Sequence, residues 1–165
     1  MRTNALKNRE FECFVLGFLF GPAYGGAEEV LLIRKRRPRW MRGKLNGIGG
    51  KLEEGECPKE GMQREMREET GLEWKLQGPF VQGPIVQGPF AILNFARLKR
   101  RVYCFTSNKK YMRSATTMTD EHVDRYGYPQ CLQCKDLADH LRWLLPLAVE
   151  HNRKSLKGLV EFNLD

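Results

Sequence analysis

The sequence predicts an α+β fold in which a mixed β-sheet lies between helices. Three observations lead to this prediction. Residues 10–20 and 97–107 alternate apolar and polar side chains as half-buried strands do, residues 58–70 combine the start and stop signals of a helix, and residues 137–152 carry apolar side chains at helical spacing. Strands that both precede and follow a helix are typical of a sheet with helices packed against it.

The first part of the chain is expected to form two strands that lead into a basic loop. Residues 10–20 alternate and then become continuously apolar, and residues 30–33 are apolar throughout. A loop with two adjacent glycines at 21–28 separates them, and residues 38–45 form a loop rich in arginine and lysine. The glycine-rich residues 46–52 then lead into the predicted helix.

The central helix is predicted over residues 58–70. Pro58 suits a first helical turn, where its missing N–H costs little, and no further proline follows within this range. Gly71 is a natural C-terminal stop because glycine readily adopts the left-handed conformation that ends many helices.

The second half of the chain is expected to add strands and a final helix. Residues 74–77 begin a strand region, residues 97–107 form a strand, and residues 137–152 form an amphipathic helix that Pro146 kinks or splits. The tripeptide Gln-Gly-Pro occurs three times within residues 77–89. Paired glycine and proline favour turns and edge segments, and the alternative is a loop that covers a substrate.

Three glutamates of the central helix, Glu65, Glu68 and Glu69, have the spacing that places side chains on one helix face. Carboxylates this close repel one another unless a cation lies among them. Oxygen ligands suit Mg²⁺ or Mn²⁺, which are commonly shared with substrate phosphates. The alternative is a solvated acidic face, but an isolated acidic cluster after a glycine-rich turn, in a chain of net charge +8, favours a metal site.

Residues 50–72 contain the pattern G-x5-E-x7-R-E-U-x-E-E-x-G-U, where U is an apolar residue. This stretch resembles the Nudix box of the Nudix hydrolases at every specified position. The resemblance implies an α/β/α sandwich in which the box forms a loop–helix–loop. It also implies an enzyme that hydrolyses a nucleoside diphosphate linked to another group with a divalent metal, expected to be Mg²⁺ with Mn²⁺ as the alternative.

The same resemblance implies roles for the matching residues. The residues expected to hold the metal are Gly50 (through its carbonyl), Glu56, Glu65, Glu68 and Glu69. Arg64 is expected to orient a box glutamate, with direct phosphate contact as the alternative. The general base is expected to be Glu68 or Glu69. The alternatives from a distant loop are Asp120, Glu121 and Asp124.

The approach to the box supplies candidate substrate contacts. Residues 44–51 resemble the corresponding segment of the MutT-like nucleoside triphosphatases, in which the residue that matches Asn46 lies at the base pocket. Asn46 and Lys51 are therefore candidate substrate-binding residues, and the alternative for Asn46 is a role in shaping the turn. Leu45 and Ile48 replace aromatic residues of that branch, so the identity of the base is left open.

Residues 34–44 contain seven cationic side chains and one tryptophan. Because they adjoin the glycine-rich turn, the cations are candidates for phosphate contacts and Trp40 is a candidate for stacking on a base. The cations expected to include a phosphate contact are Arg34, Arg36, Arg39 and Arg42. The alternative is an ordinary solvated loop.

The composition excludes several classes of protein. The chain has 165 residues, of which 41% are hydrophobic, which suits a single domain over residues 1–165. No apolar run reaches the ~18–20 residues of a membrane span, so we expect a cytoplasmic protein without a membrane partner. Five cysteines, an odd number, do not form a secreted disulfide framework. Cys131 and Cys134 are expected to be ordinary thiols, with a zinc site as the alternative.

The function predicted from these features is the hydrolysis of a (d)NTP, a small-molecule nucleotide, to a (d)NMP and pyrophosphate. The first alternative is a Nudix enzyme that acts on RNA 5′ ends, ADP-ribose or a dinucleotide. The second is a non-catalytic nucleic-acid-binding module, against which the complete set of glutamates argues. The net charge of +8 favours polyanionic ligands without choosing among them. The oligomeric state is left open.

Overall fold

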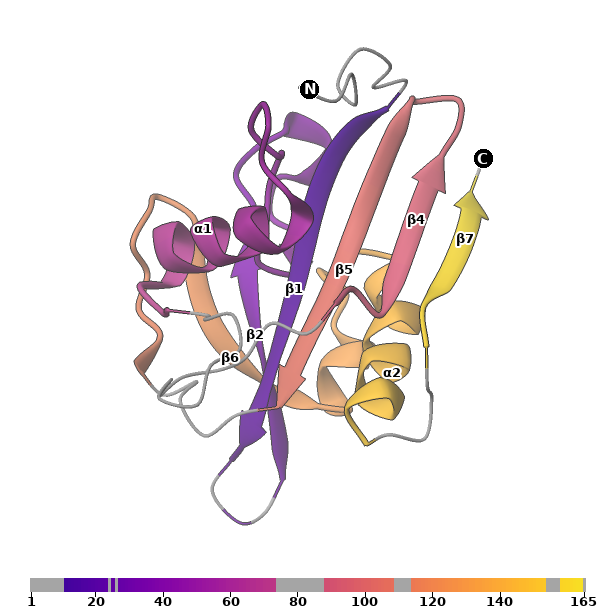
Figure 1. Ribbon diagram of the computed structural model, residues 1–165. Helices are drawn as coiled ribbons and strands as arrows, with labels where there is room; N and C mark the ends of the chain where they lie inside the picture. The colour runs from indigo at the N-terminus through magenta and orange to yellow at the C-terminus, as the bar shows by residue number, and fades with distance from the viewer. Residues whose placement is uncertain are drawn as a thin grey trace, which may run out of the picture.

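The computed structural model describes residues 11–23, 25, 27–73, 88–108, 114–153 and 158–164. These residues form a seven-stranded mixed sheet with helix α1 on one face and helix α2 on the other (Figure 1). The strands are β1 (Glu12–Pro22), β2 (Glu28–Arg34), β3 (Leu45–Asn46), β4 (Ala91–Phe95), β5 (Arg100–Asn108), β6 (His122–Tyr128) and β7 (Val160–Leu164). The helices are α1 (Pro58–Thr70) and α2 (Leu141–Asn152), with 3₁₀ turns at Arg39–Met41 and Gln130–Gln133.

The sheet is mixed. Two of its strand pairs are parallel, β1 with β5 and β4 with β7, and the other pairs are antiparallel. Its order is β3-β2-β1-β5-β4-β7, and β6 pairs with the edge of β2 opposite to β1 and β3. The predicted α+β fold with a mixed sheet between helices is therefore confirmed.

Two apolar cores form because successive side chains of a strand point to opposite faces. On β1, Val15 and Leu19 join the core under α1, whereas Phe18 and Phe20 join the core under α2. Met62 and Met66 complete the first core from α1, four residues apart on one helix face. The α2 side is completed by Leu141, Leu144, Leu145 and Ala148.

The glycine-rich segment before α1 lies directly against β1. Strand β1 pairs with β2 only near its carboxyl end, and its earlier part instead exchanges hydrogen bonds with residues 48–52. Val15 N–H donates to the Gly50 carbonyl at 2.9 Å, and Gly17 N–H donates to the Ile48 carbonyl at 2.7 Å. The segment that leads into α1 is thereby fixed to the centre of the sheet.

Helix α1 has the bounds that the sequence predicts. Pro58 occupies its first position, and Cys57 N–H donates to the Glu60 carboxylate at 3.0 Å, which satisfies one of the free donors at the helix start. Gly71 ends the helix with φ 72°, in the left-handed region where glycine has no Cβ to clash.

The predicted start of α2 was wrong, and of the two effects predicted for Pro146, a kink or a split, the split does not occur. The helix begins at Leu141 rather than at position 137, because Leu45 N–H and carbonyl bond the backbone of Asp136 and Ala138 and hold this stretch extended against β3. Pro146 also lies inside a continuous helix instead of splitting it. Proline removes one backbone hydrogen bond, and buried apolar residues on either side, Leu144 and Leu145 before it and Ala148 and Val149 after it, hold the helix in place.

Strand bounds were predicted only in part. Three of the predicted strands shift to β1, β2 and β5, while β3, β4, β6 and β7 were not predicted. Strand β6 escapes recognition because of its polar sequence, in which only Val123 is buried. The strand region at 74–77 and the first two Gln-Gly-Pro units lie outside the described residues. Within the described part of the chain, no helix is long and apolar enough to cross a membrane.

Gly49→Ala should destabilise the protein, because an added Cβ would lie 2.1 Å from the Val15 carbonyl oxygen, which belongs to the central strand and cannot easily move. We expect a loss of about 2–3 kcal/mol in the free energy of unfolding, measured by denaturant titration. Gly127→Ala on β6 is the control, since its nearest neighbour is the flexible Gln130 side chain at 3.5 Å. Equal stability of the two variants would contradict the close approach.

Candidate active site

Two of the three clustered glutamates of α1 face the sheet and the third faces solvent. Glu69 is buried, with 8% of its surface exposed, whereas the Glu68 side chain is 52% exposed. Glu65 lies between these extremes and faces the glycine-rich segment. The carboxylates of this helix therefore range from buried (Glu69) through half-buried (Glu65) to exposed (Glu68).

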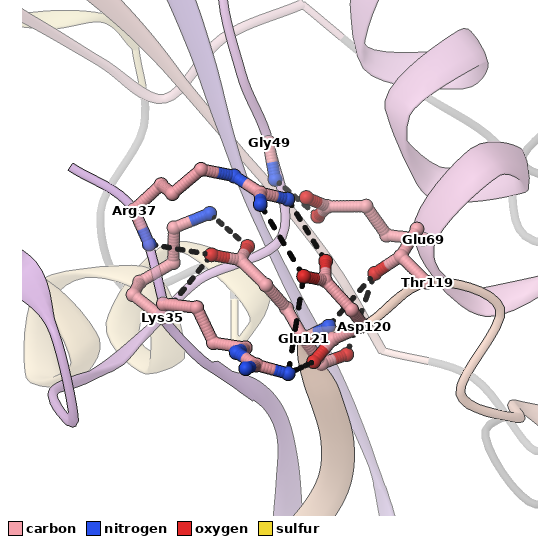
Figure 2. A network of polar contacts seen from close by, with 8 residues as sticks. Lys35, Arg37, Gly49, Glu69, Thr119, Asp120 and Glu121 are labelled. Atoms are coloured by element: carbon pink, nitrogen blue, oxygen red, sulfur yellow. Dashed lines mark hydrogen bonds and ion pairs between the residues drawn. The ribbon is translucent and has the colours of Figure 1, made fainter.

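Glu69 is held against the glycine-rich segment by a single backbone hydrogen bond. Gly49 N–H donates to its carboxylate at 3.0 Å (Figure 2). Burial raises the pKa of Glu69 to about 7, and the nearby charge of Lys35 and the Gly49 N–H oppose this rise without cancelling it. Near neutral pH, Glu69 can therefore either hold or accept a proton.

Glu65 depends on the absence of a side chain at Gly50. A Cβ at that position would lie 2.5 Å from a Glu65 carboxylate oxygen, so only glycine lets the carboxylate rest on the main chain. Burial raises the pKa of Glu65, and the adjacent Arg64 guanidinium acts in the opposite direction.

Arg64 binds three carboxylates of the box at once. Its guanidinium donates to both oxygens of Glu56, at 2.8 and 3.0 Å, to Glu65 at 2.8 Å and to Glu68 at 3.1 Å. It also donates to the Lys51 carbonyl at 3.1 Å. The bidentate contact lowers the pKa of Glu56. The expected role of Arg64 in orienting a box glutamate agrees with these contacts.

A second acidic group comes from the segment before β6. Glu121 is buried and accepts hydrogen bonds from the Lys35 ammonium and from the backbone N–H of Arg36 and Arg37 (Figure 2). Burial acts to raise the pKa of Glu121, but these donors outweigh it and lower the pKa. Glu121 therefore stays ionised.

The segment that carries Glu121 reaches the site by packing along the end of α1. Thr116 N–H donates to the Thr70 carbonyl at 3.0 Å, and Met118 N–H donates to the Glu69 carbonyl at 3.3 Å. Of the other acids considered for this region, Asp120 pairs with Arg37 at 2.8 Å and Asp124 is exposed on β6.

Lys35 is a site residue that the sequence prediction missed, although strand alternation carries the signal. Leu31 and Ile33 of β2 belong to the core under α1, and Lys35 continues the same face toward Glu121 and Glu69. Arg34 belongs to the other face and pairs with Asp136 at 3.0 Å.

The remaining predicted substrate residues lie in different surroundings. Lys51 pairs with Glu12 at 2.5 Å, outside the contacts of Glu69. Asn46 is half-buried, and its side-chain oxygen lies 3.0 Å from Nε2 of His140. The predicted ligand-contacting residues that are exposed on the loop between β2 and β3 are Arg36, Arg39, Trp40 and Arg42.

The carboxylates suit a divalent cation by their chemistry. Burial raises the pKa values of the half-buried Glu65 and the buried Glu69, and the carboxylates of the box offer hard oxygen atoms as ligands. In the described residues, no three or more acidic, histidine or cysteine side chains converge on one point, and the Arg64 guanidinium supplies positive charge to the cluster.

The surroundings of Cys131 bear on the alternative of a zinc site. Cys131 is buried among the apolar residues under α2, and burial raises the pKa of its thiol to about 11. His140, the nearest histidine in sequence, lies against Asn46.

Solved structures show the same fold in several proteins. The NUDIX domain of NrtR from Shewanella oneidensis, in complex with ADP ribose, matches with TM-score 0.63 and 21% identity over 92% of this chain and 93% of that one. A NUDIX hydrolase from Nitrosomonas europaea matches with TM-score 0.60 and 18% identity over 93% and 79% of the two chains. The MutT protein of Methanosarcina mazei Go1 matches with TM-score 0.58 and 20% identity over 89% and 96%.

A family model that matches most of the sequence shows the family of this chain. The NUDIX domain family model matches residues 17–146, which include the whole box, the glycine-rich segment, Lys35 and Glu121. The observed loop–helix–loop and its carboxylates occupy the places that the resemblance implied. This chain belongs to the Nudix family of hydrolases.

Proposed function

We propose that this protein is a divalent-metal-dependent pyrophosphohydrolase that converts a (d)NTP into a (d)NMP and pyrophosphate. The observation that carries the proposal is the placement of Glu69. It is a buried carboxylate with a pKa of about 7, held by Gly49 N–H beside an intact set of box glutamates. A purely binding module has no need of such a group next to a site for phosphates.

The metal-holding residues in this proposal are Gly50, Glu56, Glu65, Glu68 and Glu69. Bound Mg²⁺, or Mn²⁺ as the alternative, would neutralise phosphate oxygens and activate water. Arg64 would keep the carboxylates oriented through its contacts with Glu56 and Glu65. The Gly50 carbonyl accepts a hydrogen bond from Val15 N–H of β1, so it would contact the metal through its second lone pair.

Glu69 is the general base that the geometry supports best. It is buried at the end of α1, and among the described residues only Gly49 N–H bonds its carboxylate, which leaves oxygen lone pairs to accept a proton from water. It would take a proton from the water whose oxygen attacks phosphorus, while the P–O–P bridge between the α- and β-phosphates breaks to give the (d)NMP and pyrophosphate. Glu121 suits this role less well, because its oxygens are occupied by three donors and its pKa is lowered.

Asn46 is proposed to contact the base of the substrate, and His140 to orient it. With the proton on Nε2, His140 donates to the Asn46 side-chain oxygen and leaves the amide NH₂ free to donate to a ligand. Burial lowers the pKa of His140, so the ring is neutral at pH 7. Arg36, which is exposed beside Asp120, is proposed to contact phosphate.

Substrates with a further group beyond the diphosphate form the second candidate class. The NrtR domain is described in complex with ADP ribose, and another NrtR structure is described with a 27mer DNA. Both matches share about one fifth of their residues with this chain, so they support the fold and leave ADP-ribose, dinucleotides and RNA 5′ ends as alternatives to (d)NTPs.

A substrate panel in Mg²⁺ tests the function. Hydrolysis of (d)NTPs with release of pyrophosphate is expected, and it should stop when excess chelator removes the metal. The panel includes oxidised (d)NTPs, ADP-ribose, diadenosine polyphosphates and triphosphate-capped RNA, with products separated by ion-exchange chromatography. Full turnover in excess chelator would rule out the metal-dependent reaction.

Single glutamate variants test the assignments within the box. Glu68→Gln and Glu69→Gln keep size and helix propensity but remove charge, so kcat should fall on the order of 10²–10⁴-fold. Glu53→Gln is the matched control, because the Glu53 side chain is 72% exposed and its nearest contact is Arg64 at 3.8 Å. Equal losses in all three variants would show that the assignment is wrong.

Base recognition is tested by kcat/KM for four dNTPs. Asn46→Ala should change the four values unevenly, because its amide offers both a donor and an acceptor to a base edge. His140→Ala should shift the preference in the same direction, and His140→Gln, which retains a donor, should restore part of it. Arg36→Ala should instead raise KM uniformly, since a guanidinium binds phosphate whatever the base. A uniform drop for Asn46→Ala would assign it a structural role.

A further inference from the structure

The turn between β6 and α2 carries two cysteines three positions apart. Cys131 lies within the 3₁₀ turn Gln130–Gln133, and Cys134 caps the end of this turn. Both are free thiols, and neither has a role in the proposed hydrolysis. The pair lies with the core under α2, on the face of the sheet opposite to α1 and its carboxylates (Figure 1). The chemistry of this pair is therefore separate from that of the box.

The backbone of the turn brings the two cysteines together. Cys134 N–H donates to the Cys131 carbonyl at 3.0 Å. A turn closed by such a bond has its first and last Cα atoms less than about 7 Å apart, and a disulfide joins Cα atoms that are roughly 4.4–6.8 Å apart. Because a 3₁₀ helix has about three residues per turn, residues three positions apart also lie on the same side of it. The backbone therefore has the spacing that a disulfide needs.

The side chains of both cysteines contact one apolar cluster. Cys131 is 6% exposed within the core under α2, and Cys134 packs against the same core while staying half-buried. Burial raises the pKa of Cys131 to about 11, and the charge that Cys134 carries as a thiolate adds a smaller rise, because the two sulfur atoms are close. The side chains thus agree with the backbone in placing the two thiols together.

Arg142 of α2 holds this turn in place. Its guanidinium donates to the Leu132 carbonyl and, at 3.0 Å, to the Cys134 carbonyl. The Cys134 carbonyl also accepts a hydrogen bond from Leu137 N–H at 3.1 Å. Two thiols in one short, well-bonded turn have a high effective concentration toward each other, which favours bond formation between them over reaction with a separate thiol.

Solvent reaches the two thiols unequally. Cys131 is buried, whereas Cys134 is half-buried and lies between the exposed residues Gln133 and Lys135. A thiol must be accessible and ionised to attack a disulfide from solution. The burial of Cys131 and its raised pKa therefore make Cys134 the first of the two to react.

We propose that Cys131 and Cys134 form a redox-active dithiol, which small-molecule disulfides such as oxidised glutathione convert into an intramolecular disulfide. The Cys134 thiolate attacks one sulfur of the small disulfide, whose S–S bond breaks, and the first small thiol leaves and takes up a proton. The Cys131 thiolate then attacks the Cys134 sulfur, and the second small thiol leaves in the same way. Two cysteine thiols are thereby oxidised, and the small disulfide is reduced to two thiols. This inference goes beyond the proposed function and does not depend on it.

Incubation of the whole folded protein with oxidised glutathione tests the dithiol. A chelator is included so that zinc, the other ligand considered for these cysteines, cannot hold the thiols. After the remaining thiols are alkylated and the protein is digested, mass spectrometry should show an intramolecular disulfide, without glutathione, in the peptide that contains Cys131 and Cys134. A peptide that keeps both thiols, or that retains glutathione on Cys134, would overturn the proposal.

Two other cysteines serve as controls within the same molecule. Cys57 is exposed and has no second cysteine in its turn, so it should keep glutathione as a mixed disulfide and show that the oxidant has reacted. Cys104 is fully buried on β5, so its thiol should stay reduced. If Cys104 lost its thiol as fast as Cys134, the reaction would not depend on the turn, and the proposal would be wrong.

Single variants separate the two steps. Without Cys131 the second exchange cannot occur, so Cys131→Ser should accumulate glutathione on Cys134 about 10-fold above the wild-type level. Cys131→Ala is the second variant, because a serine hydroxyl in the apolar core costs stability. In Cys134→Ser, the buried Cys131 should lose its thiol about 10-fold more slowly than in the wild type. Equal glutathione on Cys134 in the wild type and both Cys131 variants, or an undiminished rate at Cys131 in Cys134→Ser, would contradict the proposed order of steps and overturn the dithiol.

Discussion

The close contact between the glycine-rich segment and β1 is the constraint on which the site depends. Gly49 lies so near the Val15 carbonyl that only a residue without a Cβ fits, and the flanking backbone hydrogen bonds join this segment to the central strand. The same main chain supplies the N–H that holds Glu69 and the surface on which Glu65 rests. Helix α1 is thus positioned from both sides, by its methionines in the core and by its carboxylates against the glycines.

The carboxylates of the site differ in how much positive charge lies beside them, and their pKa values differ accordingly. Glu56 and Glu121 each have a cation and stay ionised, as their lowered pKa values show. Glu69 has one backbone donor and only the field of Lys35, so burial dominates and its pKa rises to about 7. A strongly perturbed pKa of this kind is typical of functional sites, which is why Glu69 is the centre of the proposed mechanism.

Family membership settles the type of chemistry more firmly than the substrate. The glutamates and glycines that define the family form the innermost part of the site, where metal and diphosphate would lie. Outside this shared set lie Asn46 with its partner His140 and the exposed loop around Trp40. A shared fold and box therefore leave the substrate of an individual member undetermined.

The sequence by itself determined the features that depend on local rules. Helix α1 was predicted residue for residue, because Pro58 and Gly71 act within their own turns, and the spacing of its glutamates follows from helical geometry. The α+β class followed from alternation on a few strands, whereas the polar β6 carries too weak a pattern to be recognised.

Only the tertiary structure decided which distant groups meet. Lys35 and Glu121 are 86 positions apart, and Asn46 and His140 are 94 apart, so no local pattern links them. Packing also decided which acids Arg64 contacts. The helix alone does not determine which of several nearby carboxylates its guanidinium reaches. Burial sets the pKa of Glu69, and burial results from the folding of the glycine-rich segment and β1 over the helix face. Spacing along the chain predicts which chemical groups are present, but desolvation and pairing arise only when separate segments pack together.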